Sequence, residues 1–286
     1  MSADDEATTA AAIAAWRNTM SCPAVDACWF LGHEQVLAKM STKDPTLGSV
    51  RASLHTFARA PTGEWEGAGF PVELSSETAL VAPSPSGALL ARAVRVEGAG
   101  AAAGREGLFP APTDAAPALG ARTRLEVSAR DGSLVAAITL PTLVYADGWF
   151  EGLAWSDDED KLVVVAEAPR DAPTRGYFAD GEAEADGTLY EHAPDWGEAK
   201  VGLRRSCCVL IDLASGGSAA VLAPTSTDIS AGTPVWGPGG ESIVFCGTYQ
   251  SVQEGVGYGV AFCMQRRASL FAVRAHASAH TRIPAG

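Results

Sequence analysis

The residues with the clearest chemical potential lie in one acidic and aromatic stretch, Tyr-Glu-His-Ala-Pro-Asp-Trp-Gly-Glu at positions 190–198. Here the carboxylates of Glu191, Asp195 and Glu198 lie close in sequence to the indole of Trp196. Carboxylates beside an aromatic ring can bind a cation or the positively charged end of a peptide. The alternative is an insertion that folds back, with Trp196 buried and the acids solvated. Both interpretations stay open.

Motifs for catalysis and for metal binding are absent from the sequence. It contains no G-x-S-x-G nucleophile elbow, no G-x-x-x-x-G-K-[ST] phosphate loop, no H-E-x-x-H and no C-x-x-C. His276 and His280 have the spacing of metal ligands on a helix, but their polar surroundings indicate a solvated turn. The acids from Asp157 to Asp160 lack the EF-hand spacing and indicate a hairpin turn. We therefore expect no catalytic residue, no metal and no cofactor in this chain.

Charge and hydropathy exclude several classes of partner. The 286 residues include 34 Asp and Glu against 21 Lys and Arg, a net charge of -13. Such a balance argues against nucleic acid and against an anionic membrane surface. No stretch approaches 18 uninterrupted apolar residues, which excludes a membrane-spanning helix. The acidic N-terminus fits neither a secretory signal nor a mitochondrial presequence, and the sparse cysteines indicate reduced thiols. These features predict a cytoplasmic protein.

The elements that must position the acidic stretch begin with a short helix. Residues 6–20 are Ala-rich, with acids at the start and Arg17 near the end, which suits the helix dipole. Ile13 and Trp16 share one face, which predicts that the helix docks through Trp16. Residues 21–48 are expected to be irregular. From residue 49 onward the pattern is that of strands and tight turns.

Three segments after residue 77 share one plan, in which an apolar run precedes a tight turn and a second β-rich run. They are residues 83–94 (PSPSGALLARAV), 155–166 (WSDDEDKLVVVA) and 236–247 (WGPGGESIVFCG). Each is followed, after an insertion of variable length, by a second hairpin. Two hairpins make a four-stranded sheet, and serial four-stranded sheets are typical of β-propeller blades. A β-sandwich would also show alternating strands, but it does not account for the recurring turn motif.

The pattern predicts an all-β fold, a partial β-propeller of four-stranded blades preceded by a short N-terminal helix. We expect a helix and lead-in over residues 1–48 and an incomplete propeller over 49–286. Its expected parts are a strand pair at 49–74 and blades at about 77–140, 150–223 and 232–284. Trp155 and Trp236 each begin a repeat, so we expect them to occupy equivalent places in successive blades.

Several of these segments resemble the acylaminoacyl-peptidase family, the acylamino-acid-releasing enzymes of the prolyl oligopeptidase group. Residues 191–213 are similar to the stretch in which D-W-G-E leads into a C-V-L-D strand. Residues 152–168 are similar to the L-S-W-S…L-L-Y-V-A-E blade opening. Residues 236–247 and 257–271 resemble the W-x-P…V-V-F-V-G and G-I-R-F-C-x-N-R-R-S-x-L-Y segments. The match runs from about Glu77 to Val273 and is most specific over residues 150–273.

The resemblance implies an N-terminal propeller that caps a C-terminal α/β-hydrolase domain carrying a Ser-Asp-His triad. Such an enzyme removes N-acylated residues from short peptides, and its propeller excludes folded proteins. This chain ends at Gly286, inside the propeller, so the implied hydrolase domain is missing and the chain alone is expected to be inactive. Glu191, Asp195, Trp196 and Glu198 are the candidates for filtering substrate. Another four residues match family motif positions without a catalytic role: Trp236, Cys263, Arg266 and Arg267.

A second function remains open, that of a stand-alone propeller-like module that binds a protein partner without catalysis. If the chain is a truncated ring, its end blades expose faces that a neighbour would cover, which predicts poor solubility or an oligomer, whereas a monodisperse monomer would favour the stand-alone module. The apolar residues expected on these faces are Ile243 to Phe245 and Leu270 to Val273 at one end, and Leu54, Phe57 and Phe70 at the other.

Overall fold

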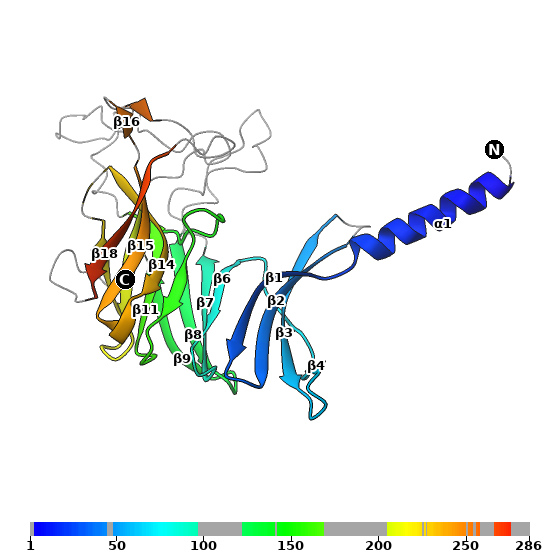
Figure 1. Ribbon diagram of the computed structural model, residues 1–286, viewed down its shortest axis with the longest axis horizontal. Coiled ribbons are helices and arrows are strands. Elements are labelled where there is room, and N and C mark those ends of the chain that lie inside the picture. Colours follow the sequence, from blue (N-terminus) through cyan, green and yellow to red (C-terminus); the bar gives the residue numbers. More distant parts are fainter. Residues whose placement is uncertain are drawn as a thin grey trace, which may run out of the picture. The chain divides into compact units, whose positions relative to one another are not determined.

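The computed structural model describes residues 3–44, 48–96, 122–140, 142–168, 205–224, 226, 228–249, 251–253, 256–257 and 266–275. It consists of one α-helix followed by antiparallel β-sheets (Figure 1). The elements form two compact units, Met1–Thr78 with Pro83–Leu90 and Ala79–Ala82 with Ala91–Gly286. Within the described residues, no helix has the length and apolar character needed to cross a membrane.

The first unit begins with helix α1 (Ala3–Met20), as the Ala-rich N-terminal segment predicts. Its side chains from Thr8 to Thr19 are exposed. The docking expected through the shared face of Ile13 and Trp16 is not seen, because these side chains are 45% and 53% exposed.

The first unit also contains a five-stranded sheet in the order β1-β2-β3-β4, with β5 paired to β3. Its strands are β1 (Ala24–Leu31), β2 (Gln35–Lys43), β3 (Val50–Arg59), β4 (Trp65–Gly67) and β5 (Val72–Glu73). The expectation of irregular structure over residues 21–48 was therefore wrong. Strand β1 lies at a sheet edge with both faces partly exposed, so its sequence lacks the alternation that marks a half-buried strand.

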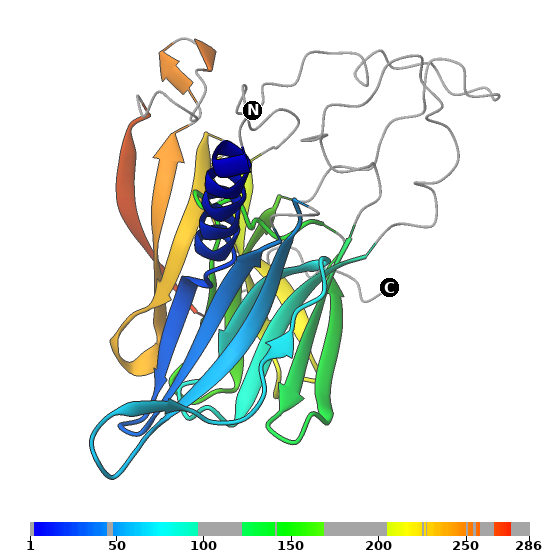
Figure 2. The same ribbon diagram turned by 90° about the vertical axis from the view of Figure 1, so that its right-hand side faces the viewer.

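Three further sheets follow in chain order (Figures 1 and 2). The first joins β6 (Thr78–Pro83), β7 (Leu89–Val96), β8 (Arg122–Ala129) and β9 (Leu134–Leu140). The second joins β10 (Leu153–Trp155), β11 (Lys161–Glu167), β12 (Ser206–Asp212) and β13 (Ser218–Ala223). The third has β14 (Ile229–Trp236), the 3-10 turn η3 (Pro238–Gly240), β15 (Ser242–Tyr249) and β18 (Ala268–Arg274). A separate hairpin pairs β16 (Ser251–Gln253) with β17 (Val256–Gly257). The last part of the blade expected at about residues 232–284, from residue 276 onward, lies outside the described residues.

Two tryptophans link these sheets in the same way. The indole N–H of Trp155 donates to the carbonyl of Ala82 at 3.0 Å, and that of Trp236 donates to the carbonyl of Ala154 at 3.1 Å. Each acceptor belongs to the first strand of the preceding sheet. Trp155 and Trp236 therefore occupy equivalent places, as the repeat predicts. We refer to this pair of interactions as the tryptophan ladder. Serial sheets joined in this way form a partial β-propeller, which excludes the sandwich alternative.

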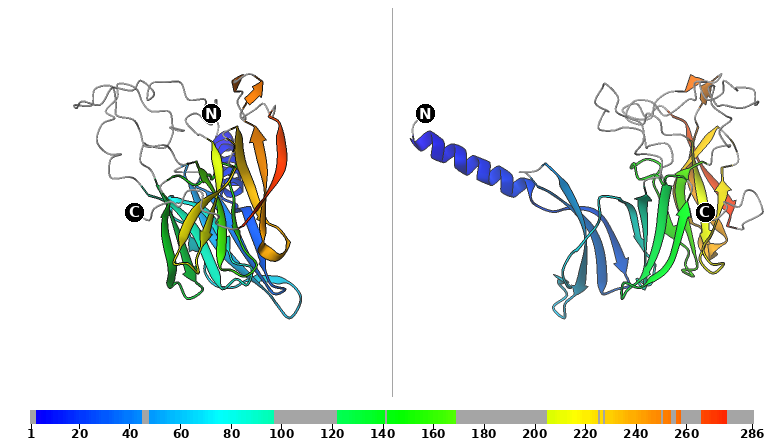
Figure 3. Two further views of the ribbon diagram at one scale, coloured as in Figure 1. Left: turned by 90° about the vertical axis from the view of Figure 1, so that its left-hand side faces the viewer. Right: turned by 180° about the vertical axis from the view of Figure 1, so that it is seen from behind.

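A hydrophobic core fills the space between the second and third of these sheets, whose strands face each other in Figure 3. Val163 and Leu210 contribute from one side, and Ile243 and Phe245 from the other. Ile243 and Phe245 are only 0% and 3% exposed, so their expected exposure at an open face was wrong. They lie on the side of β15 that packs against the preceding sheet.

Other residues expected at open faces divide in the same manner. Leu270 is 79% exposed and Phe70 is 97% exposed, as expected. Leu54 is buried instead, at the centre of β3. Apolar character alone therefore did not tell which side of a strand lacks a neighbour.

Candidate functional site

The long connections of the three serial sheets all occupy the same place in the repeat. They join the second strand of each sheet to the third, between β7 and β8, between β11 and β12, and between β15 and β18. The other connections within these sheets are tight turns, such as residues 156–160 and 213–217. Because the strands are antiparallel, each long connection leaves and re-enters at one end of its sheet. We call this the insertion end and the opposite one the turn end.

The predicted site residues belong to the connection between β11 and β12. Glu191, Asp195, Trp196 and Glu198 lie outside the described residues, so the contacts of their side chains stay a prediction. The strands place this connection at the insertion end of the second sheet, where the carboxylate-bearing Glu167 is buried at the end of β11.

The return point of this connection is tied to the third sheet. The Ser206 hydroxyl, fully buried, donates to the Ala231 carbonyl at 2.6 Å, and the Ser206 amide donates to the Ser230 hydroxyl at 3.2 Å. Next to it, Arg205 donates to the carbonyls of Pro224 and Ser226, both at 3.1 Å. These bonds hold the C-terminal end of the connection against the third sheet. Residues 169–204 of the connection lie outside the described residues.

Positive charge gathers at the insertion end of the third sheet. The Arg267 guanidinium lies over the Tyr249 ring at 5.2 Å from its centroid, and Arg266 donates to the Tyr249 carbonyl at 3.4 Å. Burial lowers the pKa of Arg266, and Asp228 opposes that change. Guanidinium groups of this kind can bind carboxylates. From the sequence, Arg266 and Arg267 were identified only as positions of the family motifs, and nothing in the sequence indicated a role for Tyr249.

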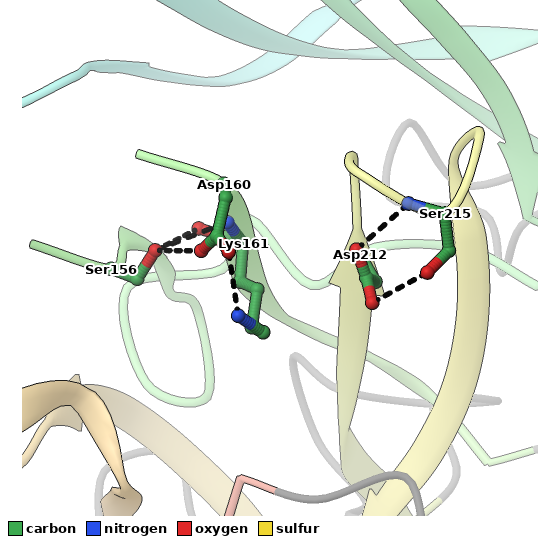
Figure 4. A network of polar contacts seen from close by, with 5 residues as sticks. All are labelled: Ser156, Asp160, Lys161, Asp212 and Ser215. Carbon is green, nitrogen blue, oxygen red and sulfur yellow. Dashed lines mark hydrogen bonds and ion pairs between the residues drawn. The ribbon is translucent and has the colours of Figure 1, made fainter. Parts of the chain in front are cut away.

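The turn end carries a polar network that stabilises its own turns (Figure 4). Lys161 Nζ lies 2.8 Å from a carboxylate oxygen of Asp160, and the Ser156 hydroxyl donates to the other at 3.2 Å. Asp212 accepts bonds from the Ser215 amide and hydroxyl at 3.0 and 2.8 Å. The Lys161 hydrogen bond lowers the pKa of Asp160, and Asp160 raises that of Lys161. Residues 157–160 form the predicted hairpin turn, and the described residues contain no grouping suited to a metal.

One serine–histidine pair occurs in the first unit. The Ser53 hydroxyl lies 2.9 Å from His55 Nε2, and the His55 ring stacks on Phe57 with centroids 6.3 Å apart. A hydrolytic triad also needs an acid on the other ring nitrogen and an oxyanion hole. Within the described part of the chain, no carboxylate bonds to His55. Sequence reasoning missed this pair, although alternate positions of one strand share a face.

Two neighbouring thiols among the described residues are shielded from reaction by burial. Cys207 and Cys208 are buried in β12, and burial raises the pKa of Cys207 to about 12. A thiol with so high a pKa stays protonated and inert at neutral pH. Cys22, Cys28 and Cys246 are free, and Cys263 lies outside the described residues.

Comparison with known proteins gives one consistent result. The family model described as "Acylamino-acid-releasing enzyme, N-terminal domain" matches residues 120–283, more than half of the chain. The acylamino-acid-releasing enzyme of Arabidopsis thaliana is 31% identical over 147 residues, covering 46% of this chain and 18% of the relative. Acylamino-acid-releasing enzyme 1 of Oryza sativa subsp. japonica is 28% identical over 221 residues, covering 71% of this chain and 25% of the relative.

A solved structure of Pyrococcus horikoshii acylaminoacyl peptidase aligns with a TM-score of 0.43 at 14% identity, over 82% of this chain and 30% of that one. A TM-score of this size leaves the fold to be argued from the sheets themselves. The chain spans about a fifth to a quarter of the length of the two plant relatives.

Proposed function

Because the chain belongs to the family of acylamino-acid-releasing enzyme N-terminal domains, we propose that it is the propeller part of such an enzyme. In this role it caps an α/β-hydrolase domain and admits short N-acylated peptides while it excludes folded proteins. The observation that carries the proposal is the family match over residues 120–283, which spans the serial sheets from β8 to β18.

The proposal assigns no catalytic step to the described residues of this chain. The one serine–histidine pair, Ser53 with His55, lacks a third member, and the thiols of Cys207 and Cys208 are buried. Acyl transfer needs a nucleophile, a base and an oxyanion hole in one place. We therefore propose that the α/β-hydrolase domain supplies all three.

The insertion end is the proposed filter. In this proposal the acidic and aromatic residues Glu191, Asp195, Trp196 and Glu198 of the β11–β12 connection act together with the cations Arg266 and Arg267. Carboxylates beside an indole suit a cationic group of a peptide, and guanidinium groups suit its terminal carboxylate. A rim that carries both kinds of group can bind a short peptide along its length.

Free thiols at Cys22, Cys28, Cys207, Cys208 and Cys246 fit the proposed cytoplasmic location.

The first test is the reading frame downstream of the codon for Gly286. A G-x-S-x-G motif within the following few hundred codons supports the proposal. A stop codon directly after Gly286 favours the stand-alone binding module instead. The 286-residue chain should not react with a fluorophosphonate probe of serine hydrolases in either case.

The proposed filter is tested in the protein encoded by the longer reading frame. Its kcat/KM is compared for an acetylated tripeptide and an acetylated 30-residue peptide. The combined change Glu191→Gln, Asp195→Asn, Trp196→Ala and Glu198→Gln should change the ratio of these two values. A matched control, Asp157→Asn with Asp158→Asn, neutralises acids of the turn end and should leave the ratio unchanged. Equal ratios in all three proteins would contradict the proposed filter.

A further inference from the structure

The outer edge of the sheet β1–β5 is formed by two short strands, β4 and β5, which both pair with β3 (Figure 1). Register places Gly67 opposite Phe57 and Val72 opposite Leu54. Only two residues of β3 lie between these partners, whereas four residues, 68–71, lie between them on the edge. The edge therefore carries a bulge. Bulges at sheet edges redirect side chains and hinder pairing with a further strand.

Phe70 lies in this bulge and is 97% exposed. Gly69 before it has a φ of +99°, which glycine adopts without steric cost, and Pro71 after it has its φ fixed by the ring. The bulge begins at an anchored point, because the Ala68 amide donates to the Thr56 carbonyl at 2.7 Å. The backbone thus projects an aromatic ring from the edge of the sheet.

Apolar and acidic side chains surround this ring along residues 64–73 (EWEGAGFPVE), which we call the Phe70 edge. Trp65 is 43% exposed and Val72 is 59% exposed. The same residues include three exposed glutamates and no lysine, arginine or histidine. Arg59 of β3 lies opposite Trp65, so the balance of charge at the edge remains negative. The glutamates are Glu64, Glu66 and Glu73.

Other outer strands do not share this character. Strands β9 and β13, the last strands of the next two sheets, read Leu-Val-Ala-Ala-Ile-Thr-Leu and Ser-Ala-Ala-Val-Leu-Ala. Neither strand contains a charge or an aromatic residue. The combination of a projected ring with carboxylates is therefore particular to the Phe70 edge and is not a general property of an outer strand.

Charge and backbone shape together indicate the kind of partner that fits. An exposed apolar patch rimmed by polar groups marks an interaction site. Pairing with the same edge of a second copy would bring three glutamates against three others, and the bulge would interrupt the strand pairing. A surface of opposite charge avoids this repulsion, and a pocket accepts the ring without any strand pairing.

We propose that the Phe70 edge docks a protein partner whose surface has an apolar pocket surrounded by lysine or arginine side chains. Phe70 fills the pocket, Trp65 and Val72 exclude water at its margin, and the glutamates pair with the surrounding cations. This docking does not depend on the proposed function, because the Phe70 edge lies outside the family match over residues 120–283.

A host molecule with the chemistry of this partner gives the first test. The probe is β-cyclodextrin with its primary hydroxyls replaced by amines, so that cations surround an apolar cavity of phenyl size. In calorimetric titration of the 286-residue chain, it should bind at least about tenfold more tightly than unsubstituted β-cyclodextrin. Phe70→Ala should weaken binding of the probe by about tenfold or more, as the loss of an aromatic anchor does.

Two matched variants separate the ring from the charges. Glu66→Gln with Glu73→Gln should lower the affinity for the cationic probe to that for unsubstituted β-cyclodextrin. Phe30→Ala removes another exposed phenylalanine of the same sheet and should leave the affinity unchanged. All of these side chains are exposed, so the variants should keep the melting temperature of the unaltered chain. Equal affinity of the unaltered chain and Phe70→Ala for the probe would overturn the proposal.

Photo-crosslinking identifies the occupant. Phe70 is replaced by p-benzoylphenylalanine, the chain is irradiated in a lysate of its source cells, and the linked peptides are sequenced by mass spectrometry. The proposal requires a link to a different protein, at a site with lysine or arginine beside apolar residues, that is lost with Glu66→Gln and Glu73→Gln.

The remaining outcomes of this experiment count against the proposal. A link to a second copy of the chain would assign the Phe70 edge to self-association. With the product of a longer reading frame, a link to its downstream part would assign the edge to a contact within one protein. A link that persists without the glutamates, or no link at all, would reject the charge-complementary partner. Neither experiment measures peptidase activity, so its result is independent of the proposed function.

Discussion

The sheet β10–β13 and the sheet β1–β5 are built from strands of similar length but differ in burial. In β11 and β12 nearly every side chain is buried on both faces. In β1, β2 and β3 only Ala38 and Leu54 are buried, and Phe30 is 71% exposed. The burial in the sheet β10–β13 comes from its neighbour, because this sheet packs against the third sheet and accepts the hydrogen bond of Trp236.

This difference in burial is apparent in the sequences of the strands. The strands β11 and β12 read Lys-Leu-Val-Val-Val-Ala-Glu and Ser-Cys-Cys-Val-Leu-Ile-Asp, continuous apolar runs of the kind found where both faces of a sheet are covered. Strand β3 alternates polar and apolar residues instead. The stability of the protein should therefore depend far more on contacts of the sheet β10–β13 than on those of the sheet β1–β5.

The largest effect is expected at the tryptophan ladder. Trp155 is 7% exposed, and Trp155→Ala should lower the free energy of unfolding by about 3 to 5 kcal/mol through lost burial and packing. Trp65 in β4 is 43% exposed, and Trp65→Ala should cost less than about 1 kcal/mol. Urea unfolding of both variants checks the contrast. Trp155→Phe removes the hydrogen bond and only part of the ring, so it should cost less than Trp155→Ala, and losses of equal size at Trp155 and Trp65 would refute the assigned role of the ladder.

A similar contrast is expected between a buried aliphatic residue and an exposed aromatic one. Leu162 in β11 is fully buried, so Leu162→Ala should cost about 2 to 5 kcal/mol. Phe30→Ala removes a larger side chain from an exposed site of β1 and should change stability by less than about 1 kcal/mol. Urea unfolding followed by circular dichroism measures both. A larger loss for Phe30→Ala would mean that the sheet β1–β5 has a covering partner in solution.

The buried thiols of β12 allow the burial of the sheet β10–β13 to be tested through the pH dependence of its stability. Burial raises the pKa of Cys207 from its ordinary value of 9.0 to about 12, so the unfolded chain loses this proton at lower pH than the folded one. The resulting stabilisation is complete below pH 9 and declines as pH rises toward 12, with a slope of up to about 1.4 kcal/mol per pH unit. Cys207→Ala should reduce this slope in unfolding measurements above pH 9.

The exposed Cys28 provides a control for the accessibility of Cys207. Ellman's reagent at pH 8 should also modify Cys28 in the folded chain while it leaves Cys207 untouched. Rapid modification of Cys207 would contradict its burial.

Sequence patterns were most informative where a repeat and a covered sheet coincide. The equivalence of Trp155 and Trp236 could be predicted because an indole before a polar turn begins both the second and the third repeat. Strand β1 could not be predicted, because an edge strand with two partly exposed faces has no periodic signal. The pair of Ser53 and His55 also escaped notice, since its meaning depends on a shared strand face and not on a motif.

For the candidate site, sequence reasoning identified acidic residues but not the surface around them. The position of the β11–β12 connection at the insertion end follows from strand order, and its link to the third sheet through Ser206 depends on tertiary packing. The arrangement of Arg267 over Tyr249 likewise joins residues that are far apart along the chain, with no local pattern to reveal it.

The smallest effect is expected at the turn end, where the ion pair of Asp160 with Lys161 is about one third exposed (Figure 4). Water screens such a pair, so Asp160→Asn should cost only about 0.2 to 1 kcal/mol.

The Lys161 hydrogen bond lowers the pKa of Asp160 below 3.8, so its contribution is present above that pH and is lost as the pH falls. The pKa of Lys161 is raised above 10.5, so its contribution is lost only at higher pH. Asp157→Asn in the same turn is the control, and urea unfolding at pH 7 and pH 3 compares the two variants. A loss above about 2 kcal/mol at pH 7 would show that this turn, and not only the ladder, determines the stability of the sheet β10–β13.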